Sequence, residues 1–114
     1  MKIIERLGHQ GDVSFRRINS LPVNVREVAS VDGLHVIAHS ETGHHHVVRA
    51  DGTVYYAGDD PLVCYLRIDA LQKEVEHLRP WDTHEPVCLA GEGAVYEIHR
   101  QCEWTPEGER MVWD

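Results

Sequence analysis

Apolar and polar residues alternate along several short stretches of this chain, and this pattern predicts β-strands. The alternation is clear in residues 62–68 and again in residues 94–104, where Arg100 is the exception on an otherwise apolar side. Successive side chains of a strand point to opposite faces, so a period of two places the apolar set on one buried face.

Turn signals separate these stretches and delimit the other expected strands. Glycine residues and Asp-Gly pairs recur between runs rich in Val, Ile and Tyr, which is typical of short antiparallel strands. The expected strands are residues 12–18, 34–39, 44–50, 53–57, 62–68, 87–90 and 94–104, with an edge segment at 111–113. Asp51-Gly52 is a hairpin turn signal, so residues 53–57 are expected to pair with residues 44–50.

Residues 69–79 fit two interpretations. Asp69 is a suitable cap for a helix in which Leu71, Val75 and Leu78 form one apolar stripe. The segment that runs on to Trp81 could equally continue a sheet, and we favour the short helix. The predicted fold class is therefore mainly β. We expect a small antiparallel barrel or sandwich and, on the favoured interpretation of residues 69–79, one short helix.

The length of 114 residues predicts one β domain over residues 1–114. Hydrophobic residues make up 42% and charged residues 26%, which is typical of a globular, soluble domain. The apolar runs are shorter than the 18 or more residues that a membrane-spanning helix needs. No membrane association is expected.

The charge balance is acidic, with 19 Asp and Glu against 11 Lys and Arg and a net charge of −8. Nucleic acids attract positive surfaces, so nucleic-acid binding is not expected, and it would require a local basic patch such as Arg16-Arg17. An acidic surface is suited to a basic protein partner. The sequence does not define the oligomeric state.

The three cysteines, Cys64, Cys88 and Cys102, are widely spaced and form no CxxC pair. An odd number of cysteines cannot make a complete disulfide framework. Three unpaired thiols predict a reducing compartment, and therefore a cytoplasmic protein.

Nine histidines are an excess for this length, and the sharpest group is His44-His45-His46. On a strand, His44 and His46 share one face and His45 faces away. Two neighbouring imidazoles can hold one metal ion, and His84 is the expected third ligand. The predicted site therefore comprises His44, His46 and His84 and takes a divalent ion, namely zinc, iron, manganese or nickel.

Three further segments of the chain are distinctive: Gln10-Gly11-Asp12-Val13, the stretch from Ser40 to His46, and the stretch from Gln101 to Pro106. Together they resemble a family of small bacterial and bacteriophage proteins of unknown activity. The resemblance matches His44 and His46 to the central TGH-x-H of that family. It matches His84 to the second histidine of an HEEH segment, whose first histidine is replaced by Trp81 here.

The histidine pattern is also similar to the metal arrangement of cupins, in which an HxH on a strand is followed by a later histidine. The glutamate that cupins place four or five residues after this pair is absent after His46. Two other roles remain open. The protein could be a non-enzymatic interaction module, phage-encoded and acting through its acidic surface, or a purely structural β domain. Whether it is an enzyme is left open by the sequence, which shows no nucleophile motif.

Overall fold

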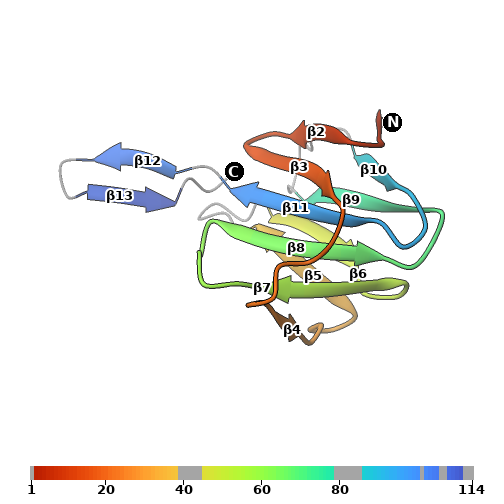
Figure 1. Ribbon diagram of the computed structural model, residues 1–114. Helices are drawn as coiled ribbons and strands as arrows, with labels where there is room; N and C mark the ends of the chain where they lie inside the picture. The colour runs from red at the N-terminus through yellow and green to blue at the C-terminus, as the bar shows by residue number, and fades with distance from the viewer. Residues whose placement is uncertain (1, 39–44, 79–85, 101, 106–107, 112–114) are drawn as a thin grey trace.

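Strands form all of the regular structure in the described part of the chain (Figure 1). The structure is a computed structural model, and it describes residues 2–38, 45–78, 86–100, 102–105 and 108–111. None of the described segments is a helix long and apolar enough to cross a membrane. The mainly β prediction is confirmed, and the described residues contain no helix.

Two sheets pack face to face, and Figure 1 shows them as a front and a back layer. The first sheet has the order β1 (Lys2–Ile4), β10 (Val87–Ala90), β9 (Gln72–Leu78), β6 (His45–Arg49) and β5 (Leu34–Ala38). The second has the order β2 (Leu7–Gln10), β3 (Val13–Ile18), β11 (Val95–Arg100), β8 (Val63–Ile68), β7 (Thr53–Ala57) and β4 (Arg26–Val28). Both sheets are open, so the fold is sandwich-like and the barrel alternative is not adopted.

A separate two-stranded hairpin follows the second sheet and extends away from both layers in Figure 1. It consists of β12 (Cys102–Thr105) and β13 (Gly108–Met111). The single long strand expected over residues 94–104 is therefore divided into β11 and β12. Antiparallel pairing was expected throughout, yet β1 pairs in parallel with β10.

The helix favoured for residues 69–79 is wrong, because β9 occupies residues 72–78. This strand pairs with β10 on one side and β6 on the other. Val75 is fully buried, whereas Leu71, which a helical stripe would bury beside it, is 79% exposed. Pairing on both sides outweighs the local capping signal of Asp69.

The predicted hairpin at Asp51-Gly52 is also wrong. The turn exists, with Gly52 at φ 70, but β6 lies in the first sheet and β7 in the second. Val48 of β6 is buried between the layers, while β7 pairs with β8 and β4. A glycine turn fixes a local reversal of the backbone, and the buried faces decide which strands become neighbours.

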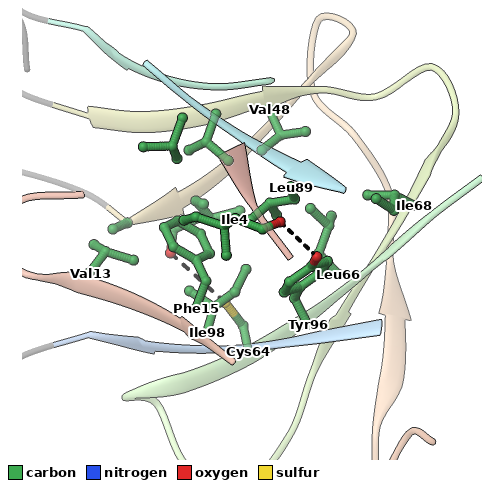
Figure 2. Packing of buried hydrophobic residues seen from close by; sticks show 14 of the residues in the cluster. Ile4, Val13, Phe15, Val48, Cys64, Leu66, Ile68, Leu89, Tyr96 and Ile98 are labelled. Atoms are coloured by element: carbon green, nitrogen blue, oxygen red, sulfur yellow. Dashed lines mark hydrogen bonds between the residues drawn. The ribbon is translucent and has the colours of Figure 1, made fainter. Parts of the chain in front are cut away.

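Alternating side chains from both sheets form the core (Figure 2). In β8, the buried residues are Cys64, Leu66 and Ile68, as the period-two pattern predicts. Cys88 on β10 is a second buried thiol, and the side chain of Cys102 lies outside the described residues.

Two side chains of β11 connect the sheets. The hydroxyl of Tyr96 lies 3.1 Å from the carbonyl oxygen of Ile4 (Figure 2) and 2.5 Å from that of Ala90, and both carbonyls belong to the first sheet. At the other end of β11, Arg100 donates through Nε to the carbonyl of Ile37 on β5, at 2.8 Å. The polar exception in the sequence pattern is therefore a contact between sheets.

Candidate functional site

His46 points from β6 into the sandwich. Its side chain is fully buried, as is that of Val48, while His45 is only half-buried. The burial along β6 does not alternate, because Val47, on the same face of the strand as His45, is buried as well. The other two predicted ligands, His44 and His84, lie outside the described residues.

Gln10, at the end of β2, is the partner of His46 across the gap between the sheets. The Gln10 amide nitrogen donates to the carbonyl oxygen of Val75 at 3.0 Å. A carbonyl oxygen only accepts, so this bond fixes which end of the amide is nitrogen. The Gln10 oxygen therefore faces the imidazole, and it lies 2.8 Å from His46 Nδ1.

This contact selects one tautomer of His46. An amide oxygen accepts a hydrogen bond, so Nδ1 carries the proton. The lone pair of the neutral ring is then on Nε2, the nitrogen that remains able to coordinate a metal ion. Metal-binding histidines are commonly oriented by a hydrogen bond of this kind at their other ring nitrogen.

The strand ends around His46 are rich in histidine. His46 pairs with Ala38 of β5 on one side and with His77 of β9 on the other. The segment 39–44 leads into β6, and the segment 79–85 follows β9. Six of the nine histidines in the sequence belong to these strand ends and segments: His39, His44, His45, His46, His77 and His84.

Sequence reasoning did not identify Gln10, which is only 3% exposed. The residue precedes the Gly11 turn and is separated from His46 by 36 positions. The contact between Gln10 and His46 forms only because the two sheets pack face to face, and no local sequence pattern indicates that packing. Within the described residues, no group of three or more His, Cys, Asp or Glu is placed to hold a metal ion.

His35 is a second buried imidazole. It is 5% exposed, and its ring centroid lies 5.3 Å from that of Tyr55. Its Nδ1 has no hydrogen-bond partner in the described part of the structure. Burial lowers the pKa of His35, since the charged ring would lose its hydration.

The stability of the protein is expected to fall below neutral pH because of His35. The unfolded chain, in which histidine has a pKa of about 6.5, binds the proton more readily than the folded protein. The stability gained by keeping the His35 ring neutral is fully present above about pH 6.5. It declines as the pH falls from there toward the lower pKa of the folded state. Because one proton is involved, the free energy of unfolding changes by at most about 1.4 kcal/mol per pH unit.

Urea unfolding of the wild type and of His35→Phe, between about pH 7.5 and 5.5, measures this dependence. The variant should show the shallower decline. A His9→Phe variant, which removes an exposed imidazole of β2, should keep the wild-type slope. Identical slopes for the wild type and His35→Phe would contradict the assignment.

A third cluster joins Cys64, Tyr55 and Arg100. Burial raises the pKa of the Cys64 thiol and that of the Tyr55 hydroxyl. Both groups therefore stay protonated, and a protonated thiol is a poor nucleophile. Arg100 Nη2 donates to the Tyr55 hydroxyl at 2.8 Å, which makes this cluster a structural contact.

Two polar side chains on the outer face of β11, Glu97 and His99, form an ion-paired cluster with Arg16 of β3. Glu97 receives hydrogen bonds from His99 at 2.6 Å and from Arg16 at 2.9 Å. Partial burial opposes ionisation of Glu97, but these hydrogen bonds and the nearby positive charges hold its pKa below the usual range. Among the described residues, this cluster is an ion-paired part of the surface.

A family model described as Domain of unknown function (DUF8820) matches residues 9–101. The matched range includes Gln10, His35, His46 and the two predicted ligands that lie outside the described residues. No curated protein and no solved structure matches the chain. The bacteriophage origin suggested by the resemblance stays a prediction.

Proposed function

Because the chain belongs to the DUF8820 family, whose description names no activity, we propose a function from the site itself. The protein binds a divalent metal ion through His46, with His44 and His84 as the other ligands. The observation that carries this proposal is the Gln10 contact, which leaves the His46 lone pair on Nε2.

The chain connectivity supports the choice of His44 and His84. His44 stands two positions before His46, so an extended backbone would direct both rings to the same side. His84 belongs to the segment that follows β9, and the end of β9 pairs with the start of β6 through Leu78 and His45. Both expected ligands are thus joined by short connections to the strand ends beside His46.

Ligand chemistry supports a borderline transition metal. Three neutral imidazoles suit zinc, iron and nickel, and manganese, which prefers oxygen ligands, is the least suited of the four ions. A site with three protein ligands leaves a coordination position for water or substrate. The proposal is limited to metal binding, because a substrate would have to be identified before any reaction is assigned.

Zinc is expected to stabilise the metal-free protein against thermal unfolding. A ligand present at 100 times its dissociation constant adds about 2.7 kcal/mol to the free energy of unfolding. His46→Ala should abolish the gain, and His45→Ala should retain it.

The affinity for zinc, measured by calorimetry, should fall as the pH is lowered from about 7.5 to 5.5, because the imidazoles take up protons.

Two further variants separate metal binding from a structural role of His46. Gln10→Leu keeps the imidazole but removes the hydrogen bond to Nδ1, and it should weaken zinc binding by about 10–100-fold. His84→Ala, in a connecting segment, should weaken binding as well. If zinc, iron, manganese and nickel all fail to bind the wild type, the Gln10–His46 pair is a buried structural contact and the proposal is wrong.

A further inference from the structure

A hollow lined by arginines lies at the edge of the second sheet, where β2 pairs with β3. Its volume is about 520 Å³, and its lining residues are Arg6, Leu7, Arg16, Arg17 and Asn19. It lies toward the Ile18 end of β3, while Gln10 pairs with Val13 at the other end. The hollow is therefore a separate feature from the His46 site.

Backbone pairing brings these arginines together. The amide of Arg17 donates to the carbonyl of Arg6 at 2.7 Å, and Leu7, which follows Arg6, pairs with Arg16. Residues nine or more positions apart in the sequence thus line one hollow. Their spacing is set by a hydrogen-bonded edge of the sheet, which is more rigid than a loop.

The guanidinium of Arg17 is seated against the backbone of Gly91. A Cβ atom added to Gly91 would lie 2.7 Å from Arg17 Nη1, so a larger residue would displace the guanidinium. Gly91 also has φ 112, a conformation that glycine adopts readily and other residues rarely. The turn after β10 is therefore shaped to accept this side chain.

The charge in the hollow is only partly balanced. Arg16 pairs with Glu97 at 2.9 Å, and Glu97 also binds His99. Arg6 and Arg17 have no carboxylate partner among the described residues. Elsewhere in the described part of the chain, Arg67 is paired with Asp69. Arg26 and Arg49 likewise have no carboxylate partner among the described residues, so what distinguishes Arg6 and Arg17 is that both line one hollow.

We propose that this hollow binds a small molecule through a phosphate group, with Arg6 and Arg17 as the main contacts. Guanidinium groups present forked donors that match phosphate oxygens, and each such charged hydrogen bond is stronger than a neutral one. Asn19 supplies a further amide donor at the rim. The overall negative charge disfavours a long polyanion, so the ligand is a small phosphate compound and not a nucleic acid.

Titration with inorganic pyrophosphate, followed by amide chemical shifts, tests the proposal. Saturable shifts are expected at residues of β2 and β3 around the hollow. The double variant Arg6→Gln/Arg17→Gln should lose at least about tenfold in affinity. The matched control Arg26→Gln/Arg49→Gln changes the net charge equally at exposed arginines elsewhere and should bind as the wild type does.

A thermal melt without pyrophosphate shows whether each variant is folded. Should the double variant be unfolded, the single variants Arg6→Gln and Arg17→Gln are compared, and each should weaken binding. Equal affinity for the double variant and its control would overturn the proposal. It would also be overturned by tighter binding of a DNA duplex at the same residues, or by no saturable shift up to about 10 mM pyrophosphate.

Discussion

Replacing Tyr96 with alanine is expected to lower the free energy of unfolding by about 3–5 kcal/mol, the usual cost of removing a large aromatic side chain from a core. Tyr96 is fully buried, and it is one of the largest buried side chains of the described residues. It lies on β11 at the centre of the second sheet, and its hydroxyl reaches the backbone of the first. The variant would lose both packing and the contact between the layers.

The conservative variant Tyr96→Phe isolates the hydroxyl. It keeps the ring and leaves the carbonyls of Ala90 and Ile4 without this donor, so a loss of about 1–2 kcal/mol is expected. Urea unfolding monitored by fluorescence measures both variants. Tyr65→Phe is the matched control on the neighbouring β8 and should change stability little. A Tyr96→Phe variant as stable as the wild type would mean that the hydroxyl does not hold the sheets together.

The strands that the sequence predicts well are those buried on one face and bordered by turn residues. In β8 every second side chain is buried, and β7 has the predicted bounds, 53–57. The missed strands β1, β2 and β4 are three or four residues long and are edge strands of their sheets. Leu7 of β2 is 71% exposed, so no apolar period identifies that strand.

The sequence indicates where a strand lies more reliably than it indicates which sheet the strand joins. The Asp51-Gly52 turn was correctly located, but it connects the two layers and does not form a hairpin. The choice depends on which faces of β6 and β7 are covered by residues distant in the sequence. The residues of the turn do not determine which distant residues cover these faces.

The candidate sites show the same difference between features set by the local sequence and contacts between distant strands. The period of two predicts that His45 and His46 face opposite sides of the strand, but the burial of His46 and its contact with Gln10 could be found only once the sheets were placed together. Arg16-Arg17 was identified as the candidate basic patch, and pairing of β2 with β3 adds Arg6 to it. Contacts within one strand are predictable from sequence, and contacts between strands require the topology.

Replacing Arg100 with methionine is expected to lower the free energy of unfolding by about 2–4 kcal/mol, because hydrogen bonds to a charged group are worth about 1.5–3 kcal/mol each and are not additive. Arg100 donates to the carbonyls of Ile37 and Pro61 at 2.8 and 2.7 Å and to the hydroxyl of Tyr55 at 2.8 Å. Methionine retains the aliphatic volume, so the change chiefly removes donors and leaves two part-buried acceptors, the Ile37 carbonyl and the Tyr55 hydroxyl, without this partner.

Two comparisons make this prediction specific to the position of Arg100. Arg100→Lys keeps the charge but cannot reproduce three donors in one plane, so its stability should lie between those of the wild type and Arg100→Met. Arg49→Met removes an exposed arginine of β6 and should cost less than about 0.5 kcal/mol. Urea unfolding of the four proteins at neutral pH measures the differences. If Arg100→Met and Arg49→Met were equally stable, Arg100 would not be holding β5 of the first sheet to β11 and β7 of the second.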